Sequence, residues 1–151
     1  MRLGSLVTIT VAEDRHYTLA HEIIIEPADF IAARTEAQVQ GRSWKATRIS
    51  TRGVDEIRSD TCPTLRTVAL SFGDLPDVPI TPMPFHLHAE AEPLPPTRKD
   101  GFVTQLRFPA RTGDGSYAVI EITQGNVYAQ WGHDAVSTLL ECWEPLTPGN
   151  D

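Results

Sequence analysis

The two cysteines are the first residues that could carry chemistry. Cys62 and Cys142 stand 80 residues apart, and each is expected at one end of an amphipathic helix. Pro63 predicts that Cys62 caps a helix, where the positive end of the helix dipole lowers the pKa of a thiol and makes it more nucleophilic. The alternatives are a Cys62–Cys142 disulfide, two unpaired structural thiols, or a redox-active or nucleophilic thiol.

The disulfide is geometrically reasonable if the two helices are antiparallel neighbours, because the start of one then lies beside the end of the other. It would close a loop of about 80 residues and stabilise the fold by on the order of 4 kcal/mol. The redox state also bears on location. A bonded pair predicts a periplasmic or secreted protein, and free thiols predict a cytoplasmic one.

A second cluster lies in the segment 85–92, which reads FHLHAEAE. Alternate side chains of a strand share a face, so His86, His88 and Glu92 would point the same way. Two imidazoles and a carboxylate suit Zn²⁺ or Fe²⁺ and would allow water activation. The HxHxxxE spacing resembles part of the first cupin motif over seven residues, and no family is assigned from it. The alternative is a polar surface strand.

A basic strand region around Trp44 could contact a partner. Trp44 and Arg48 would share one face of the strand, which suits stacking and charge pairing. The net charge of −7 disfavours nucleic acid or an anionic membrane as the partner, so we expect another protein. After Arg111 the chain has six acids and no Lys or Arg. This predicts either a solvated dipolar surface or an acidic face that meets a basic partner.

Hydrophobic periodicity and turn residues predict the elements that would position these groups. Strands are expected over residues 5–11, 17–25, 44–51, 54–59, 102–108, 117–123 and 127–131. Helices are expected from Pro27 to Gly41, from Pro63 to Gly73, and from about His133 to Trp143. The last two helices have similar apolar stripes, at 65/68/69/72 and 136/139/140/143.

These elements predict an α+β fold, in which hairpin–helix (ββα) units build an antiparallel sheet with helices on one face. The turn at Gly53 is matched by Gly125, 72 residues on, and the two helical stripes are 71 residues apart. An internal repeat would explain these offsets, with residues 5–40 as a weaker third copy. Chance similarity between two amphipathic helices is the alternative.

A single domain is expected over residues 1–151, since this length suffices for one hydrophobic core. It would consist of a ββα-ββα part (5–75), an ordered proline-rich crossing (76–96) and a βββα part (101–145). The crossing holds seven of the twelve prolines. No stretch reaches the roughly 18 apolar residues that a membrane span requires.

Together these observations favour a non-catalytic protein-binding module that needs no cofactor. An inhibitor, an immunity-type antidote or a small accessory subunit, acting through a sheet or helix face, would fit. The alternative is a small metal-binding protein or metal-dependent enzyme that uses His86, His88 and Glu92 with Zn or Fe. The oligomeric state is left open.

Overall fold

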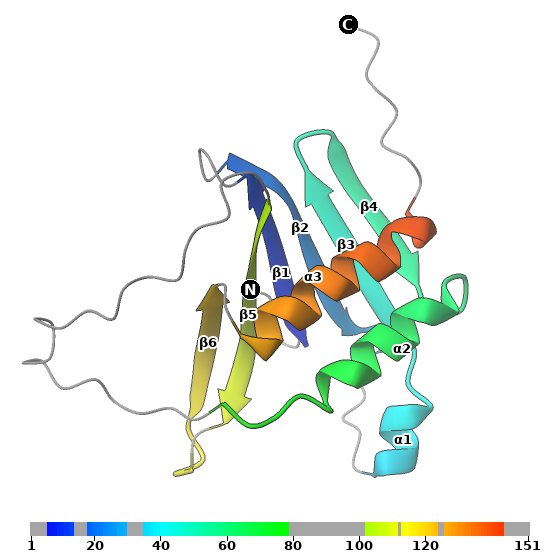
Figure 1. The fold of residues 1–151 in the computed structure, drawn as a ribbon. Coiled ribbons are helices and arrows are strands. Elements are labelled where there is room, and N and C mark those ends of the chain that lie inside the picture. Colours follow the sequence, from blue (N-terminus) through cyan, green and yellow to red (C-terminus); the bar gives the residue numbers. More distant parts are fainter. Residues whose placement is uncertain are drawn as a thin grey trace, which may run out of the picture.

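One antiparallel sheet carries two helices on one of its faces (Figure 1), so the fold belongs to the predicted α+β class. The computed structural model describes residues 6–13, 18–29, 35–78, 102–111, 113–123 and 126–143. The strands are β1 (Val7–Glu13), β2 (Thr18–Pro27), β3 (Trp44–Ser50), β4 (Gly53–Arg58), β5 (Phe102–Arg111) and β6 (Tyr117–Thr123). The helices are α1 (Glu36–Gln40), α2 (Pro63–Phe72) and α3 (Val127–Leu139), and a 3-10 turn, η2 (Leu140–Cys142), follows α3.

The strand order in the sheet is β4-β3-β2-β1-β5-β6, and every neighbouring pair is antiparallel. The first strand of the chain therefore lies in the middle of the sheet. Pairing of β5 with β1 joins residues 102–111 to the N-terminal part of the fold. The described sheet ends at two edge strands, β4 and β6.

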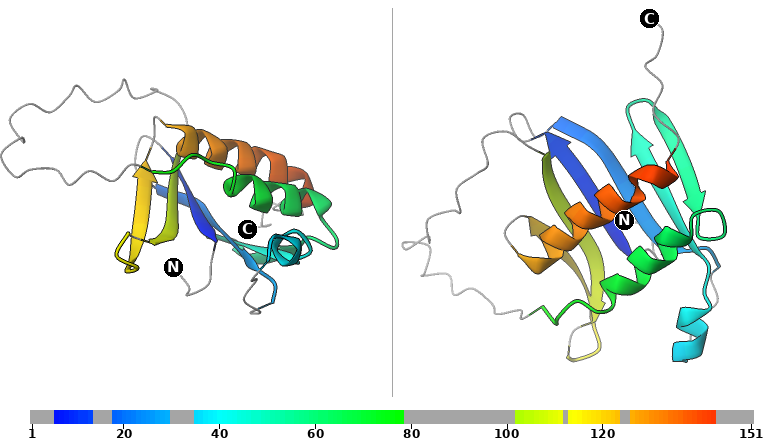
Figure 2. Two further views of the ribbon diagram at one scale, coloured as in Figure 1. Left: turned by 90° about the horizontal axis from the view of Figure 1, so that it is seen from below. Right: turned by 45° about the vertical axis from the view of Figure 1, so that its right-hand side comes forward.

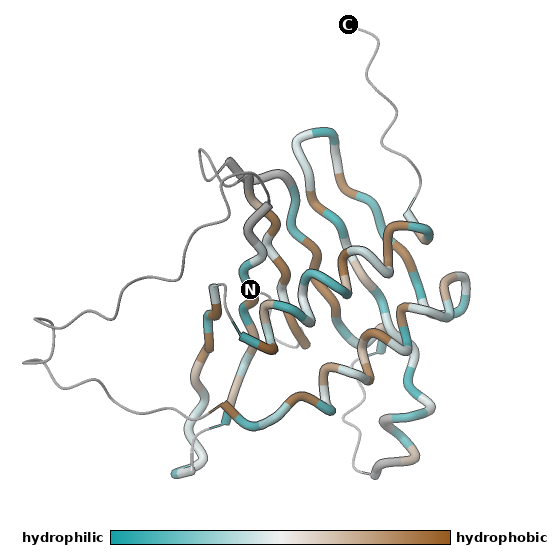
Figure 3. The backbone as a smooth tube through the Cα atoms, viewed as in Figure 1, coloured by the Kyte–Doolittle hydropathy of each residue, from teal (hydrophilic) through white to brown (hydrophobic). Residues whose placement is uncertain are grey.

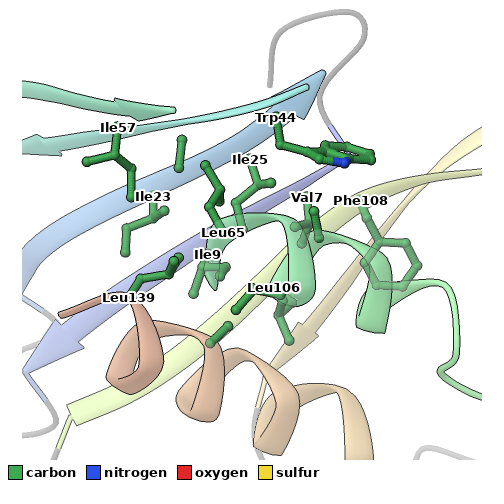
Figure 4. Close-up of a cluster of buried hydrophobic side chains, with 14 of the residues drawn as sticks. Val7, Ile9, Ile23, Ile25, Trp44, Ile57, Leu65, Leu106, Phe108 and Leu139 are labelled. Carbon is green, nitrogen blue, oxygen red and sulfur yellow. The ribbon is translucent and has the colours of Figure 1, made fainter. Parts of the chain in front are cut away.

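Strand alternation separates the core face from the opposite face. The tube coloured by hydropathy shows the change from apolar to polar residues along the strands (Figure 3). Apolar side chains from the sheet point toward α2 and α3 and meet those of the helices (Figure 4). The largest fully buried side chains are Val7, Ile9, Ile23, Ile25, Leu65, Leu106 and Leu139.

The helices α2 and α3 lie side by side on the sheet and run in opposite directions (Figures 1 and 2). At one end, Cys62 before α2 is bonded to Cys142 after α3, with 5.9 Å between their Cα atoms. At the other end, the indole Nε1 of Trp131 donates to Ser71 Oγ at 2.9 Å. Of the three alternatives for the cysteines, the structure has the disulfide, and the two helices are antiparallel neighbours as that alternative requires.

The strand predicted over residues 127–131 is wrong, because these residues form the start of α3. Asn126 caps the helix: its side-chain oxygen accepts from the backbone N–H groups of Tyr128 and Ala129, each at 3.0 Å. A cap of this kind satisfies donors at the helix start that would otherwise lack a partner. The helix therefore begins before His133, and Asp134 lies within it.

The predicted helix start at Pro27 is also wrong, since Pro27 is the last residue of β2 and lies opposite Trp44. Proline is tolerated there because the pairing of β2 with β1 ends at Ile25, opposite Val7, so no partner needs a proline N–H.

The internal repeat is not confirmed. The matching turn at Gly125 was expected between two strands, and α3 begins directly after this point instead. The apolar stripe of α3 also differs from the expected one, because Leu140 is 59% exposed. The buried residues of α3 are Tyr128, Ala129, Gly132, Ala135 and Leu139.

Within the described part of the chain, no helix combines the length and the apolar character that crossing a membrane would require.

Candidate functional site

The cysteines belong to the framework of the fold, and both sulfur atoms are used in the disulfide. Cys62 is buried at the start of α2, and its side chain makes no capping hydrogen bond. The alternatives of two unpaired thiols and of a nucleophilic Cys62 do not apply to this bonded state. The bond instead fixes the end of α3 to the junction between β4 and α2.

The predicted metal ligands His86, His88 and Glu92 lie outside the described residues, as does most of the predicted crossing over residues 76–96. Among the residues that the structure does describe, no group of three or more His, Cys, Asp or Glu side chains could hold a metal ion. The metal hypothesis therefore stays a prediction from the sequence.

Trp44 and Arg48, the predicted partner contacts, lie on the helix-covered face of β3 and are 5% and 7% exposed. The backbone of Trp44 pairs with Ser59, whose Oγ accepts from the Trp44 N–H at 2.9 Å. Neither side chain is presented at the surface in this structure. Their suggested role toward a partner stays untested, and their observed contacts are internal.

Arg48 organises a polar cluster beyond the end of α3. Its guanidinium donates to Asp55 Oδ2 from Nη2 at 2.7 Å and from Nε at 3.1 Å. The same group lies 4.8 Å from the ring centroid of Trp143, a cation–π contact. On the neighbouring strand, burial and the charge of Arg48 hold the pKa of His21 below its ordinary value. These contacts hold the buried guanidinium of Arg48 in place between Asp55 and Trp143.

An aromatic cluster occupies the other end of the helix pair. Phe72 makes edge-on contacts with Phe108 and Trp131, and Phe108 stacks on Tyr128 with 5.4 Å between ring centroids. The Tyr128 hydroxyl donates to the carbonyl oxygen of Pro76. Burial, and secondarily the negative charge of Asp77, raise the pKa of Tyr128. A tyrosine held this way stays protonated near neutral pH, so we assign it to packing.

The face of the sheet opposite the helices is open mainly at its two edges. In the middle of that face, Thr8, Ile24 and Thr47 are only 4%, 5% and 7% exposed. At the β6 edge, by contrast, Tyr117 is 83% exposed and Val119 is 56% exposed. Both side chains are on this face, because they alternate along β6 with Ile120 and Ile122, which pack on the core side.

Exposed apolar residues gather at β6 more than elsewhere. The large apolar residues with exposed side chains among the described residues are Val54, Tyr117, Val119, Val127 and Leu140. Only Tyr117 and Val119 belong to one strand, and they are adjacent on its outer face. We name this pair, with the rest of β6, the β6 edge. Isolated exposed apolar residues are ordinary, whereas two neighbouring ones on an edge strand form a candidate contact surface.

The strand over residues 117–123 is confirmed as predicted, but it was not among the predicted sites. The signal was present in the letters YAVIEIT, which have a single charge and strong β-propensity. Its meaning depends on whether the strand lies inside the sheet or at its end, and the order of the strands decides that.

A comparison with protein-family models finds no match, and searches of curated proteins and of solved structures find none either. The function must therefore be inferred from the surface and the chemistry of the described residues.

Proposed function

We propose that this chain is a protein-binding module, and that it acts through the β6 edge as an inhibitor, an immunity-type antidote or a small accessory subunit. The observation that carries the proposal is the pair of exposed apolar side chains on an edge strand, Tyr117 and Val119. Apolar side chains that are left in water on an edge strand favour association with another surface.

The charge of the chain supports a protein partner of opposite sign. The net charge is −7, and the residues after Arg111 include six acids but no Lys or Arg. Such a surface repels nucleic acid and attracts basic proteins, chiefly by speeding encounter. A basic partner protein is therefore the partner that we propose.

The proposal can be tested by affinity purification from the native host with the full chain as bait, followed by reconstitution with the purified partner. Val119→Lys should weaken binding of that partner at least about tenfold, because a lysine cannot be desolvated at an apolar contact without cost. Val54→Lys is the matched control: the residue, the substitution and the edge-strand setting are the same, but β4 replaces β6.

A partner that binds both variants equally well would refute the β6 edge as the binding surface. Purification of the chain as a solitary monomer, with no partner that can be reconstituted, would refute the protein-binding function itself.

A further inference from the structure

We propose that the β6 edge binds an extended, basic segment of the partner as an added β-strand. This inference rests on the proposed protein-binding function and specifies the form and chemistry of the partner. It depends on which backbone groups of β6 face away from the sheet and on the charges near them. It also depends on the contrast with the β4 edge, which is charged and closed at one end.

The hydrogen-bonding pattern of the sheet decides which β6 groups are open. Ala28 N–H donates to the carbonyl of Ser43 at 2.9 Å, directly beyond the last pair of β2 and β3. Bonded and non-bonded pairs alternate in an antiparallel ladder. The pair Ile24–Thr47 is therefore bonded, so Ile25 points its backbone groups toward β1.

The same alternation can be followed to the edge. Ile25 bonds with Val7, so Thr8 bonds on the other side of β1 with Arg107. On β5 the next residue, Phe108, then bonds with Ile120 of β6. The backbone N–H and C=O groups of the even-numbered residues of β6 thus point toward β5. Residues with N–H and C=O groups that face outward are Tyr117, Val119, Glu121 and Thr123.

Pro109 provides an independent check. It lies opposite Val119 and has no N–H to donate. The alternation makes Pro109–Val119 a non-bonded pair, so the pairing of β5 with β6 loses no hydrogen bond through the missing proline N–H. Val119 therefore directs both its backbone groups and its exposed side chain to the outside, and nothing among the described residues pairs with this side of β6. Unpaired edges of this kind accept strands from partner proteins.

The net charge of −7 favours a basic segment over an acidic one. The acids on and next to β6 are Glu121 and, in the turn before the strand, Asp114. On the neighbouring strand β5, Arg107 and Arg111 lie opposite Glu121 and Tyr117. Glu121 is one of the outward-facing residues of β6. Its side chain accepts from Arg107 at 2.7 Å but remains 46% exposed, so a cation on an added strand can reach it. A second copy of the chain would bring together two chains of net charge −7, which disfavours self-pairing.

The chemistry of the segment follows from the two faces of β6. Residues of the added strand that lie beside Val119 and Glu121 should be Lys, Arg or Thr, since this side is exposed and carries the Glu121 carboxylate. Residues beside Ile120 and Ile122 should be apolar, because Ile122 is 9% exposed and packs into the core. A segment that alternates basic or small polar residues with Val or Ile meets both conditions.

The test uses the full chain and a synthetic nine-residue peptide in which Lys and Thr alternate with Val and Ile. We expect saturable changes in the NMR amide signals of residues 117–123 when this peptide is added. A second peptide with Glu in place of each Lys should bind at least about tenfold more weakly.

Backbone methylation separates strand pairing from side-chain attraction. We take the added strand to be antiparallel, as every neighbouring pair in the sheet is. The alternation of side chains then fixes which peptide amides face β6, namely those of the Lys and Thr residues. N-methylation of those amides should abolish binding, whereas N-methylation of the Val and Ile amides should leave the dissociation constant within about twofold. Equal effects of the two methylation patterns, signal changes away from β6, or equal binding of the Glu peptide would overturn the inference.

Sedimentation of the free chain at rising concentration tests whether a second copy of the chain, instead of a partner segment, binds at the β6 edge. A monomer supports the inference, and a dimer that Val119→Lys dissociates would overturn it. The proposed function and the strand addition can fail separately. If Val119→Lys weakens binding of a reconstituted partner but the peptide does not displace that partner, the proposed function is retained and strand addition is excluded.

Discussion

The two edges of the sheet are built differently. Strand β4 has three charged residues in six, Asp55, Glu56 and Arg58, whereas β6 has only Glu121 in seven. The outward-facing carbonyl of Arg58 already accepts from the N–H groups of Thr61 and Cys62, at 3.1 and 2.8 Å. The β4 edge is thus closed at one end and charged along its length.

Natural sheets block their edges with charges, turns or coverings, because an open edge invites pairing with other chains. Strand β4 follows this rule and β6 does not. Among the described residues, the β6 edge is both apolar and unpaired while the β4 edge is protected, and this difference supports the proposal that β6 is a binding surface.

The β4 side and the β6 side of the sheet are also held in place differently. The β4 side is held by the Cys62–Cys142 bond and by the contact of Arg48 with Asp55 and Trp143. The β6 side is held by close packing of α3 on β5. There Gly132 leaves so little room that an added Cβ would lie 3.0 Å from Thr104 Cγ2 and 3.1 Å from Leu106 Cδ1.

Removal of the disulfide should produce the largest effect. The double substitution Cys62→Ala and Cys142→Ala should lower the free energy of unfolding by about 2–4 kcal/mol, because the open chain gains the entropy that the crosslink removes. Urea denaturation without reductant measures the loss. Hydrogen exchange should show the loosening first at β4, α2 and η2, while β6 keeps its pairing with β5. A loss below about 1 kcal/mol, or loosening that begins at β6, would contradict this view of the bracing.

Gly132→Ala should weaken the β6 side. The new methyl group collides with Thr104 and Leu106, which costs about 1–3 kcal/mol as overpacking and is offset by about 1 kcal/mol of helix propensity. We expect a net loss of up to about 2 kcal/mol in thermal or urea unfolding. Thr138→Ala, at an exposed position of the same helix, is the control and should stay within about 0.5 kcal/mol of the parent chain. If Gly132→Ala stabilises the chain, α3 is not seated closely on β5.

A smaller, pH-dependent effect is expected on the β4 side. Burial and the charge of Arg48 lower the pKa of His21 below 6.5, so the folded state favours the neutral imidazole. The neutral form contributes its full stability above about pH 6.5, and this contribution is lost as the pH falls through that value toward the lowered pKa. His21→Gln should therefore flatten the stability profile between pH 7.5 and 5.5. A parent chain that gains stability relative to this variant on acidification would show the opposite sign.

Much of the fold could be predicted because local signals agreed with it. Pro63 and the apolar stripe of Leu65, Val68 and Ala69 defined α2, and alternation defined β3 and β6. The disulfide was one of three alternatives from the sequence, and antiparallel helices made it geometrically reasonable. The start of α3 was missed because Asn126 after a glycine suits a hairpin turn as well as a helix cap, and only the bonds to Tyr128 and Ala129 decide between them.

The candidate site was not predictable from local signals. Trp44 and Arg48 had the right residue types for a contact surface, but β3 lies second in the sheet with α2 packed against it. The β6 edge is open because β5 pairs with β1, a contact between residues almost 100 positions apart that no local pattern encodes. Edge position is a property of the sheet order, and so the site became visible only with the fold.

Amide hydrogen exchange along β6 tests the central claim most directly. In the free chain, the outward amides of Val119 and Glu121 should exchange rapidly, while the inward amides of Ile120 and Ile122 should exchange slowly. The Lys-containing peptide should then slow the outward amides and leave those of β4 unchanged. Outward amides that are already protected in the free monomer, or that stay unprotected when the peptide is bound, would contradict the assignment of β6 as an open edge that accepts a strand.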